Sequence, residues 1–152
     1  MKYRNLISVV FILIFGLFET ISGMAIPNDC TVIEEVINTI GNDLQKSYKS
    51  KTLNSCCDFS QIICQNFNNQ TAITEIKFNN YKNLSNQDME KIISQFAKLP
   101  HLTTLEMANN LIVGELPNNL SELKNLEILD LSGNCLEDND ANTKLNIKEL
   151  KI

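Results

Sequence analysis

Residues 99–136 read LPHLTTLEMANNLIVGELPNNLSELKNLEILDLSGNCL and contain one apolar pattern twice. The pattern is LxxLxxLxLxxNxL, and each position recurs 24 residues later, as from Leu105 to Leu129. The first copy is Leu99, Leu102, Leu105, Met107, Asn110 and Ile112, and the second is Leu123, Leu126, Leu129, Leu131, Asn134 and Leu136. A fixed period of roughly 20 to 29 residues is typical of a solenoid of stacked coils. Because one coil cannot bury its own apolar edge, neighbouring coils must share a core.

Each copy of the pattern predicts a short strand followed by a turn. Side chains alternate along a strand, so we expect Leu105 and Met107 to point inward and Glu106 to point outward. Asn110 follows the strand, where its side-chain amide can satisfy buried backbone groups. The first copy continues as GELP from Gly114 to Pro117.

This longer run resembles the plant-type leucine-rich repeat LxxLxxLxLxxNxLxGxIPxxLxxL, with Leu116 in the isoleucine place. The family includes the ectodomains of plant receptor-like kinases and receptor-like proteins, and the secreted polygalacturonase-inhibiting proteins. The resemblance implies an α/β leucine-rich repeat solenoid. Its short parallel β-sheet would form the concave face, its N-terminal cap would be helical, and its convex side would mix α-helix and 3-10 helix.

Flanking segments extend the repeats to residues 71–152, about four coils with the last incomplete. In the first coil, Ile73, Ile76 and Phe78 take the places of Leu102, Leu105 and Met107. Residues 84–99 have a helical apolar stripe with Ser85 as its cap, which makes this coil longer. The last coil restarts at Leu145, Ile147, Leu150 and Ile152, and we expect its strand to leave an open, unpaired edge.

The N-terminus has the pattern of a secretory signal peptide. Lys2 and Arg4 precede an apolar run from Leu6 to Phe18, and small residues end at Ala25, after which we expect cleavage. An uncleaved anchor is the alternative, although this run is shorter than the roughly 20 residues that span a bilayer. No later segment is apolar enough to cross a membrane, so we expect a secreted protein. The net charge of −5, without a clustered basic face, argues against nucleic-acid binding.

Residues 26–70 are expected to form the N-terminal cap. An apolar stripe predicts one helix from Asp29 to about Tyr48, capped by Asp29 or Thr31. Four cysteines follow the signal peptide closely, and in an exported protein they indicate disulfides. Four cysteines allow three connectivities, and their spacing disfavours a zinc site.

The family resemblance implies one pairing among these cysteines, namely Cys30 with Cys56 and Cys57 with Cys64. Cys135 is the fifth cysteine, and it is predicted to be either a free thiol or the partner in an intermolecular disulfide.

Catalysis has little support in the sequence. No nucleophile motif, phosphate-binding loop or metal-spaced cluster is present, so we expect no enzyme activity, no cofactor and no metal. His101 lies in a link between coils and is expected at the surface.

Outward strand positions form columns across a parallel sheet, and these columns are the candidate binding face. The central column is Lys77, Glu106, Asp130 and Lys151, and the column before it is Glu75, Thr104, Ile128 and Glu149. The predicted ligand-binding residues are Glu75, Lys77, Thr104, Glu106, Ile128 and Asp130. The alternative is an ordinary solvated face, since outward strand positions are usually polar.

The sequence therefore predicts a secreted, non-catalytic protein that recognises an extracellular protein or a cell-wall polysaccharide through its concave sheet. The alternative is an assembly component, in which the open C-terminal coil or Cys135 joins chains, for example as a homodimer. Three sequons, at Asn69, Asn83 and Asn119, predict N-linked glycans outside the strands.

Overall fold

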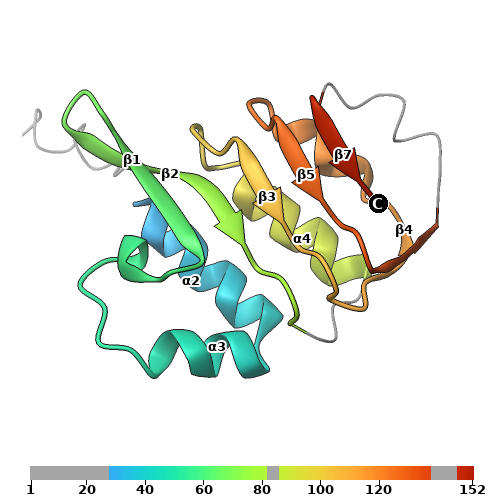
Figure 1. The fold of residues 1–152 in the computed structure, drawn as a ribbon, viewed down its shortest axis with the longest axis horizontal. Coiled ribbons are helices and arrows are strands. Elements are labelled where there is room, and N and C mark those ends of the chain that lie inside the picture. Colours follow the sequence, from blue (N-terminus) through green and yellow to red (C-terminus); the bar gives the residue numbers. More distant parts are fainter. Residues whose placement is uncertain (1–27, 82–85, 138–146) are drawn as a thin grey trace, which may run out of the picture.

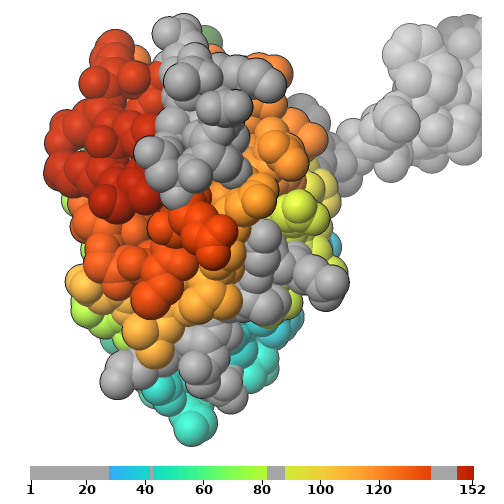
Figure 2. All heavy atoms as spheres, turned by 90° about the vertical axis from the view of Figure 1, so that its right-hand side faces the viewer, coloured from blue at the N-terminus to red at the C-terminus, as the bar shows by residue number. Residues whose placement is uncertain are grey.

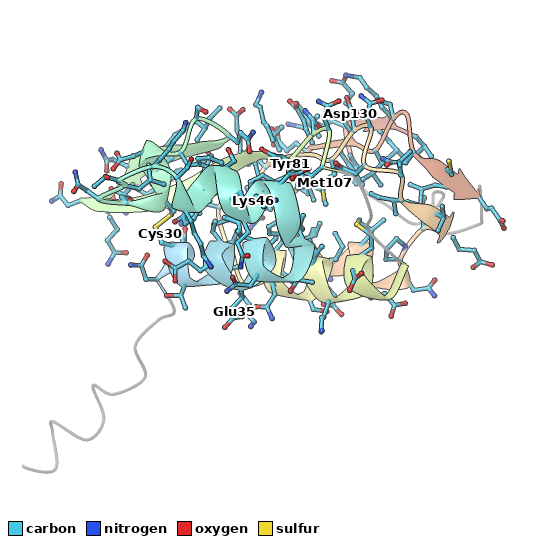
Figure 3. The ribbon with its side chains drawn as sticks, turned by 90° about the horizontal axis from the view of Figure 1, so that it is seen from below. Cys30, Glu35, Lys46, Tyr81, Met107 and Asp130 are labelled. Atoms are coloured by element: carbon cyan, nitrogen blue, oxygen red, sulfur yellow. A yellow bond between two sulfur atoms is a disulfide. The ribbon has the colours of Figure 1, made fainter. Side chains whose placement is uncertain are left out.

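The computed structural model describes residues 28–81, 86–137 and 147–152. The predicted signal peptide, Asn83 and Ser85 lie outside these residues. A five-stranded sheet forms one layer and helices pack beneath it (Figures 1 and 3). The strands, in spatial order, are β1 (Ile62–Phe67), β2 (Gln70–Lys77), β3 (Thr104–Glu106), β5 (Ile128–Asp130) and β7 (Glu149–Lys151).

The parallel part of the sheet follows the sequence repeat. β2, β3, β5 and β7 are parallel neighbours, and their registers align Ile76, Leu105, Leu129 and Leu150 in one row. A second sheet pairs β4 (Val113–Glu115) with β6 (Cys135–Glu137), which again joins residues of successive coils. The stacked coils predicted from the repeat, and the parallel sheet that the family resemblance implies, are thus present.

Asparagines tie each coil to the next one, as the repeat pattern predicts. Asn110 is buried, its Nδ2 donates to the carbonyl of Phe78 at 2.6 Å, and its Oδ1 accepts from the amide of Tyr81 at 2.5 Å. Asn134 repeats this role one coil later, because its Oδ1 accepts from the amides of Asn110 and Ile112. These bonds satisfy backbone groups at turns that have no strand partner.

The convex side carries α4 (Asn86–Phe96) and the 3-10 helix η2 (Asn118–Glu122). The predicted stripe of α4 is fully buried and consists of Met89, Ile92, Ile93 and Phe96. The repeat is longest where α4 occurs, since an α-helix rises only about 1.5 Å per residue and needs more residues than an extended segment.

The helical cap differs from the prediction of a single helix. The apolar stripe is buried, but the chain breaks at Gly41, where φ is 68°, into α2 (Asp29–Ile40) and α3 (Asn42–Lys49). A positive φ suits glycine and ends a helix, so α3 turns away from α2. The N-cap is Asn28, whose side chain accepts from the amide of Cys30, rather than Asp29 or Thr31.

Two disulfides join α2 and β1 of the cap through the short 3-10 helix η1 (Cys56–Asp58). They link Cys30 to Cys56 and Cys57 to Cys64. This is the pairing that the family resemblance implies. Within residues 28–81, 86–137 and 147–152, none of the helices has the length and hydropathy needed to cross a bilayer.

A strand that the sequence analysis did not anticipate closes the cap side of the sheet. β1 pairs antiparallel with β2, and the hairpin turns at Asn68 and Asn69, both with positive φ. Asparagine tolerates this backbone region better than most residues, which suits a two-residue hairpin turn. The paired asparagines between two β-rich runs were the signal for this strand.

Candidate recognition face

The parallel sheet brings all six predicted binding residues together. Its register places Glu75, Thr104, Ile128 and Glu149 in one row. The next outward row holds Lys77, Glu106, Asp130 and Lys151. Figure 3 shows Asp130 on the sheet side of the molecule and Glu35 on the opposite, helical side. We call these two rows the recognition face.

Ion pairs at the cap side of the face engage Lys77. Its Nζ lies 3.0 Å from Glu106 Oε1 and 3.5 Å from Glu75 Oε2. The second carboxylate oxygen of Glu106 accepts a hydrogen bond from Asn79 Nδ2 at 3.1 Å. The hydrogen bond to Glu106, together with the nearby negative charges, raises the pKa of Lys77 above its ordinary value. Lys77 therefore stays charged and holds Glu106 in place.

A second group surrounds Asp130 at the other side of the face. Its Oδ1 accepts from the amide of Ser132 at 3.0 Å and from Ser132 Oγ at 2.6 Å. Lys151 Nζ lies 3.7 Å from Asp130 and 2.9 Å from Glu149. Partial burial acts to raise the pKa of Asp130, but these hydrogen bonds and the charge of Lys151 outweigh it and lower that pKa. The hydrogen bond to Glu149 raises the pKa of Lys151.

The order of charges across the central row is positive, negative, negative, positive. Glu106 and Asp130 are neighbours in the register, so about 4.8 Å separates their strands. Each carboxylate has its lysine on the outer side, and like charges in adjacent positions repel. The centre of the recognition face is consequently suited to a positively charged group.

The two remaining predicted residues differ in what they offer a ligand. Ile128 is half-buried, whereas Thr104 has only 8% of its surface exposed and presents little to a ligand. Asn79 and Ser132 occupy the next outward column, and the sequence analysis did not assign them to the site. The structure shows that they orient the carboxylates of Glu106 and Asp130, a role that only the three-dimensional contacts reveal.

Three further predictions concern residues away from this face. Cys135 is an exposed free thiol on β6. The C-terminal part of the chain, coloured orange to red, forms much of the face toward the viewer in Figure 2. Asn69 is exposed at the hairpin turn, as a glycan acceptor requires. Asn119 differs, because its Nδ2 donates to the carbonyl of Glu90 at 2.8 Å and to Ser94 Oγ at 2.9 Å. A glycan on Asn119 would replace at least one of these bonds.

The described part of the chain contains no cluster of side chains that could bind a metal ion. No three or more His, Cys, Asp or Glu side chains lie close enough together there to hold an ion. His101 lies against Phe67, with ring centroids 4.2 Å apart and planes 13° apart. Its surroundings are those of a surface contact between the hairpin and a loop.

Comparison with known proteins finds a plant receptor. The sequence is 29% identical over 110 residues to phytosulfokine receptor 1 of Arabidopsis thaliana, a match that covers 72% of this chain. The chain spans only 10% of the length of that receptor. No protein-family model matches the chain.

Solved structures with a similar fold are also plant ectodomains. The structure of the BIR3–SERK2 complex from Arabidopsis thaliana gives a TM-score of 0.58 at 18% identity and covers 82% of this chain and 68% of that one. The BIR2 ectodomain from the same plant gives a TM-score of 0.51 at 21% identity and covers 72% of this chain and 56% of that one. At these identities the likeness concerns the fold. The repeat sequence, the stacked coils and these similarities show a leucine-rich-repeat solenoid whose fold is similar to that of plant receptor ectodomains.

Proposed function

We propose that this chain is a secreted, non-catalytic recognition protein whose recognition face binds an extracellular protein. Its mature form would begin after Ala25, with residues 26–70 as the cap and residues 71–152 as the repeats. Two disulfides in the cap support an oxidising, extracellular location. The BIR3–SERK2 structure supports a protein partner, since it is a complex of two proteins and contains a chain of similar fold.

The paired carboxylates of Glu106 and Asp130 carry this proposal. A lysine or arginine of the partner, placed between them, would gain attraction from both and would relieve their mutual repulsion. Both carboxylates are already oriented by bonds within the chain, so little side-chain entropy is lost on binding. Their side chains are 26% and 19% exposed, and a partner would therefore displace little water from them.

The recognition face is small for a complete interface. Four strands at about 4.8 Å spacing, each with a three-residue paired segment at about 3.3 Å per residue, cover a patch of about 14 by 10 Å. Specific complexes usually bury about 800 Å² on each partner. The partner would therefore also contact loops beside the sheet, and the face would supply the central charged contact.

Site-specific photo-crosslinking tests the proposal. A photoreactive residue at Ile128 is compared with one at Glu35, which lies on the opposite side of the molecule (Figure 3). The full chain is incubated with the extracellular proteins of its source. We expect a protein adduct from position 128 only, and its loss when Glu106→Lys and Asp130→Lys are combined. Adducts at position 35 alone, or an adduct at 128 that the double variant retains, would contradict the proposal.

The exposed thiol of Cys135 favours a second candidate function, the joining of chains. An intermolecular disulfide there would link two copies into a homodimer. The mass of the secreted chain under non-reducing conditions distinguishes the two functions. A dimer that Cys135→Ser abolishes would support assembly, whereas a monomer with an alkylatable thiol would exclude a disulfide-linked dimer.

A further inference from the structure

A groove lies beside the edge of the sheet at which β3 and β5 begin. Its volume of about 780 Å³ is within the usual range of ligand sites. One wall is the β1–β2 hairpin, which extends beyond that edge (Figure 1). The described lining residues include none of the six predicted for the recognition face. They include Phe67, His101, Lys124, Asn125, Glu127 and Lys148.

The walls of this hairpin groove are held together by contacts within the chain. The stacked rings of Phe67 and His101 join the hairpin to the loop before β3. Thr103 donates to the carbonyl of Thr74 through both its amide, at 2.9 Å, and its hydroxyl, at 3.1 Å. Since these contacts are present without a ligand, little conformational entropy of the walls would be lost on binding.

Side-chain amides lie on two sides of the groove. Gln65 comes from the hairpin, and Asn125 comes from the loop before β5, where its Nδ2 donates to the carbonyl of Pro100 at 2.7 Å. An amide side chain offers both a donor and an acceptor. This combination suits the backbone of a peptide, which presents the same two groups at every residue.

The rim of the groove carries an unbalanced positive charge. Lys148 is neutralised by Glu127, with Nζ 2.8 Å from Oε1. Lys124 Nζ donates to the carbonyl of Ser121 at 2.8 Å, and it forms no ion pair with a carboxylate of the described residues. The rim therefore carries one lysine charge that is not balanced there, in a chain whose net charge is −5.

We propose that the hairpin groove binds an extended acidic peptide segment of a partner protein. A carboxylate of the peptide pairs with Lys124, and an apolar or aromatic side chain packs beside Phe67. From β2 to β7 is about 14 Å at the spacing of sheet strands, which about four extended residues span. The groove is separate from the recognition face, so this inference goes beyond the function proposed above.

Peptide selection on the full chain, secreted from a eukaryotic host, tests the proposal. Random hexapeptides displayed on phage are selected, and the affinity of each enriched peptide is measured by fluorescence anisotropy. We expect enriched peptides to combine Asp or Glu with an aromatic or large aliphatic residue. Lys124→Glu replaces attraction by repulsion and should weaken their binding roughly tenfold. Lys91→Glu makes the same charge change at an exposed position of α4, outside the groove, and should leave the affinity unchanged.

Two further variants complete the design. Phe67→Ala should also weaken binding, whereas Glu106→Gln with Asp130→Asn should not, because those residues lie outside the groove. Selection of no peptide, or of peptides that bind Lys124→Glu as well as the unaltered chain, would overturn the proposal. So would binding of an acidic heparin oligosaccharide through Lys124 in the absence of any selected peptide.

Discussion

Replacement of Asn110 by alanine tests whether the side-chain bonds of Asn110 and Asn134, here called the asparagine ladder, hold the coils together. The residue is completely buried and lies between the first two coils. In Asn110→Ala, the carbonyl of Phe78 loses its donor at 2.6 Å and the amide of Tyr81 loses its acceptor at 2.5 Å. A buried polar group left without a partner costs about 1 to 3 kcal/mol. Two such groups give an expected loss of about 3 kcal/mol in the free energy of unfolding.

This loss is a large part of the roughly 5 to 15 kcal/mol that stabilises a typical domain. Urea denaturation, followed by circular dichroism, measures it as a fall in the midpoint at constant slope. Asn125→Ala is the matched control, because Asn125 is exposed and makes one side-chain bond, to Pro100. We expect the control to lose less than about 1 kcal/mol. Equal losses in the two variants would refute the reasoning that burial makes the ladder important.

Four further substitutions test other parts of the molecule. Asn119→Ala should lower the melting temperature of the protein, because it removes two hydrogen bonds to α4. Since those bonds engage the amide of Asn119, the same variant should leave the glycan mass unchanged in mass spectrometry. Asn69→Gln should remove the mass of one glycan. Gly133→Ala should destabilise the fold by about 1 to 2 kcal/mol in urea denaturation, since φ is +68° and the new Cβ would lie 2.1 Å from Asn109 Oδ1. The lowered pKa of Asp130 favours folding above the unfolded pKa of about 3.9, and this contribution is lost as the pH falls through the lower folded value. Asp130→Asn should therefore show a smaller loss of stability between about pH 5 and pH 2 than the unaltered chain.

The outward charges illustrate how far the sequence predicts the candidate site. A strand period of two and a repeat of 24 residues place Glu106 beside Asp130, and the sheet register agrees. The pattern does not show that each carboxylate is already bonded to a lysine and to a polar neighbour. Ion pairs depend on the rotamers of long side chains, which sequence spacing leaves open. The burial of Thr104 was not foreseen either, because spacing along the chain predicts the direction of a side chain but not its exposure.

The cap shows the limit of local patterns. An unbroken apolar stripe from Val32 to Leu44 predicts one helix, and both of these residues are buried. Gly41 lies within the stripe, and only the packing of α3 against α2 decides that it takes a positive φ and breaks the helix. Similarly, Asn119 is part of a sequon in the sequence, but its amide reaches α4 across a gap of 25 to 29 residues.

The sequence by itself determined the stacking of coils and, with the family resemblance, the parallel sheet and the columns of outward residues. The physical reason is that coils must stack to bury an apolar edge, and the spacing of the apolar residues that form this edge can be read from the sequence. Tertiary structure decided the break at Gly41, the hairpin that adds β1, and the groove between Phe67 and Lys124. These features involve segments that do not follow the 24-residue repeat. Their geometry is therefore set by packing between elements.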